Sequence, residues 1–261
     1  MLPKFGIFQF SVTSVTSVAK MESGVRVDPR ELYNRQWEAL KRDPRGFEVF
    51  QEPLFESGEH PQNFIDHQCA FAAFHIRRAE PQEILDVGSY RHFILGLLAH
   101  SPLTTIDVRP RRPTVENETI ITGDAKRLPL PDDSFDLIVS LCALEHFGLG
   151  RYGDAFDPAA DREAFSEMVR VLRPGGSLIF TTTITRAAPS IAFNAHRIYN
   201  HPMLQSFCVG LTCVEEKFYS HEKKGFCSFQ EVTDKPRWWD VYCGCWEKAK
   251  SREQRAKGNG H

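Results

Sequence analysis

Three aspartates stand where short apolar runs end, and their spacing suits a nucleoside-type ligand. Asp86, Asp107 and Asp124 follow or close three successive runs that we expect to be strands. In an open parallel sheet, ligands bind at the carboxyl ends of the strands. Gly88 would let the backbone approach a ligand closely, and Asp107 follows it by 19 residues (107 − 88), near the spacing of about 20 for a ribose-binding acid. Aspartate is common in turns, so a single one predicts little; three at the ends of successive strands together predict a nucleoside-type pocket.

A second group of chemistry-bearing residues lies in the loop after the apolar run 137–141. His146 is the candidate general base, because an imidazole of near-neutral pKa can take a proton from a hydroxyl or amine. Glu145 would orient the imidazole or contact the substrate. The alternative is a structural histidine that holds the following glycine-rich turn.

Further polar residues would form a rim around this loop. Arg151 and Asp154 belong to the loop itself, and Asn194 and Arg197 lie in a polar connection downstream. They would contact a polar substrate, or pair with one another across the loops.

The elements that position these residues follow from periodicity. A βαβ unit is predicted for residues 137–183. Its strands would be the apolar runs 137–141 and 177–183, the second of which follows Pro174-Gly175-Gly176. Its helix is indicated by the three- and four-residue spacing of Phe165, Met168, Val169 and Leu172. A further strand with its turn is expected at residues 83–89, and others at 103–108, 119–122, 211–220 and 238–246, with the last two as an antiparallel pair at the sheet edge. Two helices, at residues 28–43 and 62–78, should precede the sheet and pack beside its ligand-binding edge. We expect an α/β, Rossmann-like, seven-stranded, mostly parallel sheet with an antiparallel last strand and an N-terminal helical extension.

Length and composition suit one α/β domain with additions. The 261 residues divide into an extension (1–27), a main domain (28–247, with helices at 28–80 and the sheet core at 81–247) and a flexible tail (248–261). The 32 basic and 34 acidic residues give no field that would attract nucleic acid or a membrane.

The cysteines and the first residues bear on the compartment. Seven cysteines in unrelated contexts do not form a disulfide framework, and Cys243 and Cys245 should share one face of a strand. Residues 5–19 are too polar for a membrane span and only faintly similar to a signal peptide. A cytoplasmic protein is expected, with secretion as the alternative.

Several strings together carry a family resemblance. The chain resembles class I S-adenosylmethionine-dependent methyltransferases in four strings. These are Leu85-Asp-Val-Gly88, Ile106-Asp-Val108, Gly123-Asp-Ala125 with the following Leu128-to-Asp136 segment, and Val171-Leu-Arg-Pro-Gly-Gly176. The segment from Glu145 to Asp154, Glu-His-Phe-Gly-Leu-Gly-Arg-Tyr-Gly-Asp, resembles a narrower methyltransferase-like family defined as a domain of unknown function.

The resemblance implies roles for individual residues. Asp107 would accept hydrogen bonds from the ribose hydroxyls, and Asp124 from the adenine amino group with the Ala125 N–H opposite. Leu141 and Cys142 would line the methyl-donor side. The implied cofactor set comprises Asp86, Gly88, Ser89, Asp107, Val108, Asp124, Ala125, Leu141 and Cys142.

The chain departs from the usual glycine-rich turn after the first strand. Gly88 is followed by Ser89, Tyr90 and Arg91 instead of alternating glycines, so Tyr90 or Arg91 would replace a backbone contact, or cofactor binding would be weakened. A Glu-His pair also resembles metal-dependent methyltransferases, with His196 as a third ligand. Those enzymes have a glutamate where this chain has Cys142, so we expect no metal.

Two functions remain, with a nicotinamide dehydrogenase as a remote third. The first is methyl transfer from S-adenosylmethionine to oxygen or nitrogen of a small-molecule or glycan-like acceptor. The second is a catalytically silent methyltransferase fold used as a binding module.

Overall fold

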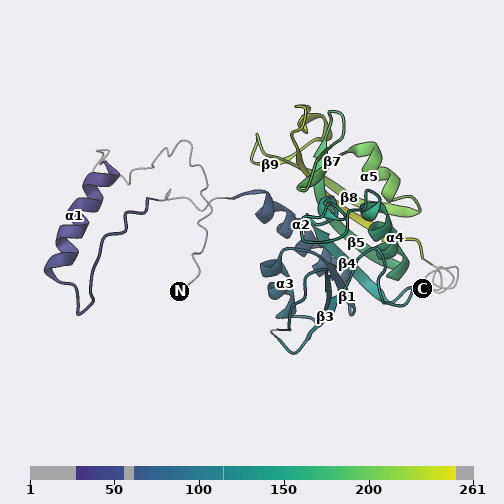
Figure 1. Cartoon of the computed structure of the whole chain (residues 1–261), viewed down its shortest axis with the longest axis horizontal. Helices are drawn as coiled ribbons and strands as arrows, with labels where there is room; N and C mark the ends of the chain where they lie inside the picture. The colour runs from purple at the N-terminus through teal and green to yellow at the C-terminus, as the bar shows by residue number, and fades with distance from the viewer. Residues whose placement is uncertain (1–27, 56–61, 114, 251–261) are drawn as a thin grey trace, which may run out of the picture. The chain divides into compact units, whose positions relative to one another are not determined.

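The computed structural model describes residues 28–55, 62–113 and 115–250. It divides the chain into two units, residues 1–61 and residues 62–261 (Figure 1). The first helix of the expected main domain (residues 28–247) falls in the first unit and its second helix in the second unit. The predicted extension (residues 1–27) and most of the tail (251–261) lie outside the described residues.

The described part of the first unit contains one helix, α1 (Pro29–Arg42). Its start follows the sequence signals, since the Asp28 side chain accepts a hydrogen bond from the Arg30 N–H at 2.9 Å and Pro29 occupies the first turn. None of its side chains is buried. After the helix the chain returns so that the rings of Tyr33 and Phe55 meet edge to face, 5.7 Å apart.

The second unit is organised around one twisted sheet. Seven principal strands, among the described residues, run in the order β3-β2-β1-β4-β5-β10-β8. Their bounds are β1 (Ile84–Val87), β2 (Leu103–Asp107), β3 (Glu118–Thr122), β4 (Phe135–Leu141), β5 (Leu172–Thr185), β8 (Leu211–Ser220) and β10 (Asp240–Lys248). The first five are parallel, and β10 is antiparallel to both β5 and β8. The expected Rossmann-like sheet with an antiparallel last strand is confirmed.

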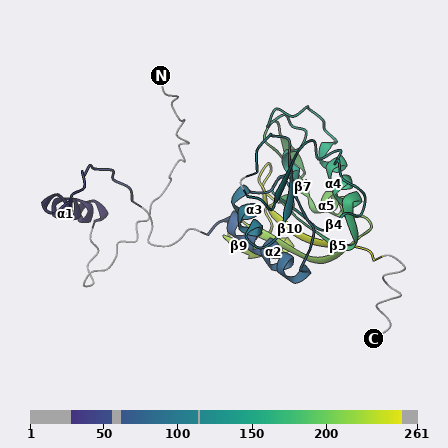
Figure 2. The same ribbon diagram turned by 90° about the horizontal axis from the view of Figure 1, so that it is seen from below.

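Helices cover both faces of this sheet (Figure 2). On one face α2 (Phe64–Ala79) and α3 (Arg91–Leu98) pack their apolar side chains against the strands. On the other face α4 (Ala160–Val171) and α5 (His201–Phe207) do the same. Two apolar cores result, one on each side of β1, β4, β5 and β10, as expected for a sheet built from βαβ units.

Three short strands were not expected. β6 (Ser190–Ala192) and β7 (His196–Asn200) form an antiparallel hairpin within the segment interpreted as a polar connection, and β7 continues the sheet beside the end of β5. β9 (Gly225–Cys227) pairs with β8, and two 3-10 turns, η1 (Leu144–His146) and η2 (Phe229–Glu231), complete the elements. Period-two alternation is too short in these segments to distinguish a strand from a loop.

Two boundaries also differ from the expectation. Helix α4 ends at Val171 and β5 begins at Leu172, so the Pro174-Gly175-Gly176 segment forms the first part of the strand, where its register against β4 shifts. Lys248 belongs to β10 and not to a tail, because its Nζ donates hydrogen bonds to the carbonyl oxygens of Val169 (2.9 Å) and Leu172 (2.6 Å).

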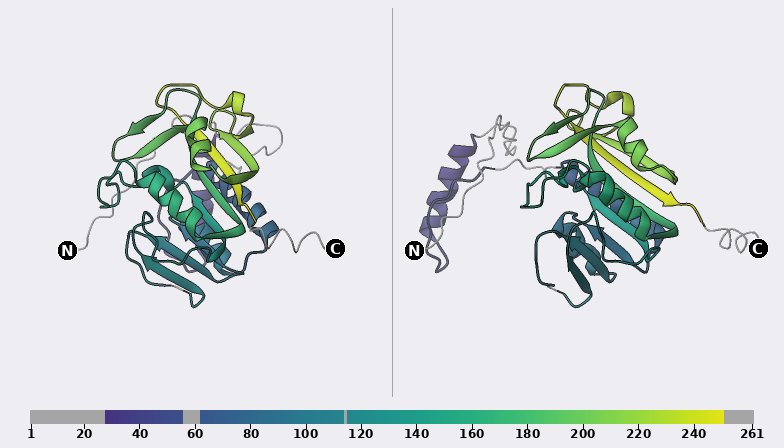
Figure 3. Two further views of the ribbon diagram at one scale, coloured as in Figure 1. Left: turned by 90° about the vertical axis from the view of Figure 1, so that its right-hand side faces the viewer. Right: turned by 45° about the vertical axis from the view of Figure 1, so that its right-hand side comes forward.

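The strand β10, yellow in Figure 3, also confirms the interpretation of the cysteines. Cys243 and Cys245 are buried in the same core, on one face of this strand, and all seven cysteines are free thiols. No helix of the described residues is both long and apolar enough to cross a membrane.

Candidate active site

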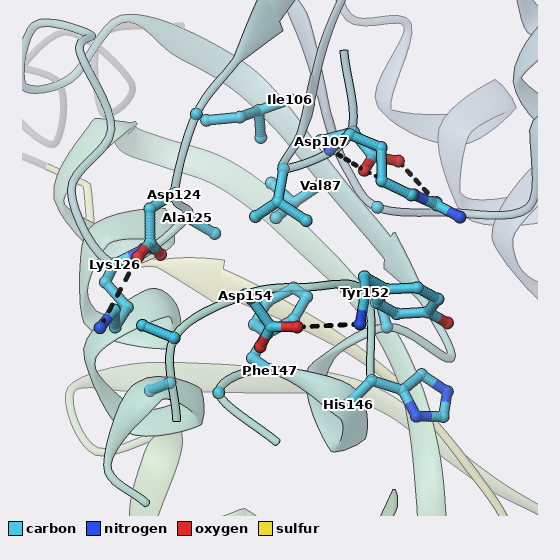
Figure 4. Close-up of a pocket in the computed structure, with 18 of the residues that line it drawn as sticks. Val87, Ile106, Asp107, Asp124, Ala125, Lys126, His146, Phe147, Tyr152 and Asp154 are labelled. Atoms are coloured by element: carbon cyan, nitrogen blue, oxygen red, sulfur yellow. Dashed lines mark hydrogen bonds and ion pairs between the residues drawn. The ribbon is translucent and has the colours of Figure 1, made fainter. Parts of the chain in front are cut away.

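A pocket opens at the carboxyl ends of the parallel strands, with about 690 Å³ of empty space when the open solvent at its mouth is included. Its walls come from the ends of β1 and β2, the turn after β3 and the loop after β4 (Figure 4). Six residues of the expected cofactor set line it: Gly88, Asp107, Val108, Asp124, Ala125 and Cys142.

The end of β2 carries a paired carboxylate. Arg109 Nε donates to Asp107 Oδ1 at 2.9 Å and Nη2 donates to Oδ2 at 2.7 Å. Burial alone would raise the pKa of Asp107, but the bonds from Arg109 outweigh it and hold the pKa below its usual value. The Arg109 guanidinium also lies over the ring of Tyr152, 4.6 Å from its centroid, which links the β2 end to the loop after β4.

The turn after β3 presents the second acidic side chain. Asp124 Oδ1 accepts the Lys126 backbone N–H at 2.9 Å, and the rest of its carboxylate is more than half exposed at the cavity. Lys126 Nζ reaches Asp157 Oδ2 at 2.6 Å and so ties this turn to the segment before α4. Ala125 lies beside Asp124, as Figure 4 shows.

Gly88 needs to be glycine at the end of β1. Its φ is +71°, and an added Cβ would lie 3.1 Å from the Ala143 Cβ. Asp86 and Ser89 shape this turn and do not line the cavity: the Ser89 N–H donates to Asp86 Oδ1 at 3.0 Å, and Ser89 Oγ accepts from the Leu141 N–H at 3.0 Å. Burial raises the pKa of Asp86 to about 7.

Neither side chain proposed to replace the missing glycines reaches the cavity. Arg91 forms a two-point ion pair with the buried carboxylate of Glu118, whose second cation is Arg111. Tyr90 is about half exposed, and its ring packs near His92 at 5.3 Å. The residues after Gly88 therefore fix the start of α3 and leave the backbone of the turn to face a ligand.

Cys142 marks the floor of the cavity after β4. Its φ of +47° lies in the left-handed region, which is uncommon for a residue with a side chain and often accompanies function. The Cys142 N–H donates to the Thr181 carbonyl at 2.9 Å and to Thr181 Oγ1 at 3.0 Å, and that hydroxyl in turn donates to Gln68 Oε1 of α2. Leu141, one residue earlier, is buried and does not line the cavity.

His146 stands at the edge of the cavity, on the same side as Tyr152 and across from Asp124 (Figure 4). Its Nδ1–H donates to the Ala195 carbonyl at 2.6 Å, which fixes the tautomer and leaves a lone pair on Nε2. Burial lowers its pKa to about 4, with a smaller contribution from the Arg151 charge. His146 is thus a neutral imidazole at pH 7, and its Nδ1 bond holds the loop as the structural alternative requires.

Glu145 is buried beneath His146. Its Oε2 accepts from Thr182 Oγ1 at 2.9 Å, and its Oε1 lies 3.9 Å from His146 Nε2. Burial raises the pKa of this carboxyl to about 7. Glu145 does not line the cavity.

The four rim residues take different positions. Arg197 is buried: its Nη1 donates to the Phe147 carbonyl at 2.6 Å, and its Nε lies 3.4 Å from Oδ2 of Asp161, an α4 residue outside the four rim positions. Asp154 lines the cavity and accepts from the Tyr152 N–H at 3.0 Å. Asn194 Nδ2 donates to the Leu149 carbonyl at 3.4 Å, and Arg151 is exposed beside His146.

Sequence reasoning missed two residues at the cavity. No role was assigned from the sequence to Arg109 or Tyr152, yet both line the cavity and contact each other. Their proximity depends on how the β2 and β4 loops meet, which local spacing does not contain. Among the described residues, no group of three acidic, histidine or cysteine side chains is placed to hold a metal ion. The rings of His196 and His146 lie edge to face, with their centroids 6.4 Å apart.

Comparison with known proteins adds to this geometry. Residues 85–180 match the family model described as a methyltransferase domain. The matched residues are less than half of the chain and include β1 to β4, α3, α4 and the first part of β5. A malonyl-[acyl-carrier protein] O-methyltransferase of Methylococcus capsulatus is 34% identical over 135 residues, which are 46% of this chain and 45% of that protein. The chain spans about half the length of the curated relatives it matches.

Two solved structures share the fold at low sequence identity. The [4+2]-cyclase SpnF superposes with a TM-score of 0.55 at 15% identity, covering 85% of this chain and 95% of that one. The 1,6-didemethyltoxoflavin N1-methyltransferase of Burkholderia thailandensis was solved with S-adenosylhomocysteine. It superposes with a TM-score of 0.52 at 15% identity, covering 88% of this chain and 94% of that one. They establish the Rossmann-like methyltransferase fold for the sheet unit.

Proposed function

We propose that this protein transfers the methyl group of S-adenosylmethionine to an oxygen or nitrogen of a small-molecule or glycan-like acceptor. The observation that carries the proposal is the cavity at the strand ends, lined by Gly88, Asp107 and Asp124 within the segment that matches a methyltransferase domain. The malonyl-carrier-protein relative, named an O-methyltransferase, supports the reaction class.

The residues of the cavity fit the cofactor chemically. Asp107 retains acceptor sites for ribose hydroxyls beside its bonds to Arg109, because an ionised carboxylate has about four lone-pair positions. Asp124 presents an exposed carboxylate for the adenine amino group, with Ala125 beside it. Gly88 keeps its turn open, and Cys142 lines the methyl-donor end. When bound, the cofactor supplies an electrophilic methyl group on a sulfonium.

The acceptor would approach from the side of His146. We propose that His146 borders the reacting atoms with Nε2 free, and that Glu145 stabilises the loop from below through Thr182. Proton removal by Nε2 is one role for His146 and shaping of the site is the other. A pKa near 4 makes the imidazole a weak base at neutral pH, which favours the second role.

Calorimetric titration with S-adenosylmethionine, S-adenosylhomocysteine and NAD tests the proposal. The first two should bind at one site and NAD should not. Binding of NAD alone, or of none of the three, would remove the proposed function.

A catalytically silent binding module is the second candidate, and one observation favours it. Arg91 is committed to Glu118 and Tyr90 does not line the cavity, so neither side chain replaces the glycines that are missing after Gly88. Tight binding of S-adenosylhomocysteine would count against loss of the cofactor site.

The string from Glu145 to Asp154 forms the loop that closes one side of the cavity, which supports a narrower family defined by that string. We also propose a reducing, cytoplasmic compartment, because all seven cysteines are free.

A further inference from the structure

We propose that the acceptor is an apolar molecule ending in a carboxylate, with its anionic head at Arg151 and its apolar body on the ring pair Phe156–Phe193. This inference rests on the proposed methyl transfer and names the class of acceptor for that site. It replaces the broader expectation of a small-molecule or glycan-like acceptor.

Arg151 supplies the cation for the head. Its Nη1 lies 3.2 Å from the Ala195 carbonyl and 3.1 Å from His146 Nδ1, so the guanidinium is held beside the imidazole at the edge of the cavity. Since Nδ1 carries its proton toward Ala195, the contact between Arg151 and His146 places two donors side by side. The Nδ1–H of His146 is already bonded to the Ala195 carbonyl, so a negatively charged oxygen of the substrate would bind the guanidinium of Arg151.

The charge of Arg151 acts on the nearby Glu145 carboxyl, but the two do not form a direct ion pair. Among the described residues, no aspartate or glutamate oxygen forms an ion pair with Arg151, whereas Arg91, Arg109, Arg170, Arg173 and Arg197 each have such a partner. Arginine binds carboxylates through two parallel bonds, and such bonds are about twice as strong as neutral ones. The charge complementarity therefore favours an anionic acceptor group.

The apolar body has a surface next to this cation. Phe156 is 62% exposed and Phe193 75% exposed, and their rings meet at 6.1 Å. Phe193 lies two residues before Ala195, which Arg151 contacts, and Phe156 follows Ala155, which lines the cavity. Ile191 on the same hairpin is 56% exposed and extends the apolar surface. Clustered exposed apolar side chains beside a cavity mark a binding surface.

The reaction balances without a protein base. A carboxylate oxygen of the acceptor attacks the methyl carbon of the cofactor, forming a C–O bond. The methyl C–S bond breaks, and its electron pair returns to sulfur, which gives the neutral thioether. The product is a neutral methyl ester, and no proton is released because the acceptor is already ionised. This chemistry accords with the neutral imidazole of His146.

Matched acids and amides test the inference on the full chain. Octanoate, butanoate, octanamide and glucuronate are titrated calorimetrically, both with and without saturating S-adenosylhomocysteine. Octanoate should bind at least tenfold more tightly than octanamide, the scale of one charged hydrogen bond. It should also bind at least tenfold more tightly than butanoate, because each buried methylene raises the affinity by about fourfold. Glucuronate should bind more weakly than octanoate.

Variants separate the head from the body. Arg151→Gln should remove the preference for octanoate over octanamide and leave the affinity for S-adenosylhomocysteine unchanged. The double change F156S/F193S should reduce both octanoate and octanamide binding equally. The control pair is Arg78 and Phe74 on α2, where an arginine also lies over an exposed ring at 5.5 Å. R78Q/F74S should leave both ligands unaffected.

Four results would overturn the inference: equal binding of acid and amide, no effect of Arg151→Gln, equal losses in the control pair, or tighter binding of glucuronate. These results concern the acceptor alone. A failure of S-adenosylhomocysteine to bind in the same titrations counts against the proposed function instead.

Discussion

The carboxylate of Asp107 and the guanidinium of Arg109 form a two-point ion pair at the end of β2, with bonds of 2.9 and 2.7 Å. Both residues line the cavity, and Arg109 also stacks on Tyr152. The pair therefore holds the Asp107 side chain in one orientation before any ligand binds, which lowers the ordering cost of binding.

Removal of either acidic side chain at the cavity should weaken cofactor binding. Asp107→Ala and Asp124→Ala should each cost about 1–3 kcal/mol of binding free energy for S-adenosylhomocysteine, the value of one or two lost hydrogen bonds. Calorimetry measures the effect, and Asp234→Ala, an exposed aspartate of the β9–β10 connection, serves as the control. Unchanged dissociation constants in both cavity variants would place the cofactor elsewhere.

A methyl group at position 88 should damage both the turn and the site. Gly88→Ala places a side chain at a φ of +71° and a Cβ 3.1 Å from Ala143, so unfolding free energy should fall by about 1–3 kcal/mol. The control is Gly96→Ala in the exposed middle of α3, where nothing lies within 4 Å of an added Cβ. That change should stabilise by roughly 0.5–1 kcal/mol. Chemical denaturation compares them, and equal effects would contradict the special role of Gly88.

Much of the fold followed from local patterns. The buried strands were identifiable because they are short, branched and bounded by turn residues, and α1 begins where Asp28 and Pro29 predict it. The parallel pairing of β4 with β5 followed from the βαβ pattern of residues 137–183, whereas the order of the strands in the sheet was not predicted. The β6–β7 hairpin was missed because its three- and five-residue strands contain no long alternation.

The site was harder to predict for a physical reason. Asp107 and Asp124 were found because each follows its own strand, so sequence position and spatial position coincide. Arg109 and Tyr152 come from loops 43 residues apart (152 − 109), and their contact depends on loop packing. Arg197 was placed on the substrate rim, but its bonds to Phe147 and Asp161 turn it into the interior.

Replacement of the buried Glu145 should change the pH dependence of stability. In the folded protein burial raises its pKa from 4.5 to about 7, so between these values the folded state holds a proton that the unfolded state has lost. Stability therefore falls as pH rises through this window. Glu145→Gln cannot ionise and keeps an acceptor for Thr182, so at pH 8 it should be more stable than wild type by about 1–3 kcal/mol.

Denaturation at pH 5 and pH 8 measures this difference. The control is Glu167→Gln, because bonds from Arg170 lower the pKa of Glu167 and the sign reverses: that variant should be less stable than wild type at pH 8. A Glu145→Gln variant that is less stable than wild type at pH 8 would show that the carboxylate is the favoured form.

The last prediction separates the two roles of His146. Burial lowers its pKa from 6.5 to about 4, so below pH 6.5 the unfolded chain takes up a proton that the folded protein does not. Stability is therefore lost as pH falls from 6.5 through 4. His146→Asn removes this loss, and the asparagine amide can still donate a hydrogen bond to the Ala195 carbonyl. With an ionised acceptor no base is needed, so turnover should fall less than about tenfold. Loss of a general base would lower it about 10²–10⁴-fold. Stability is measured by denaturation between pH 4 and 8, and turnover by methyl transfer to octanoate. A loss above about 100-fold, with cofactor affinity and stability unchanged, would make His146 the base and require an acceptor that carries a proton.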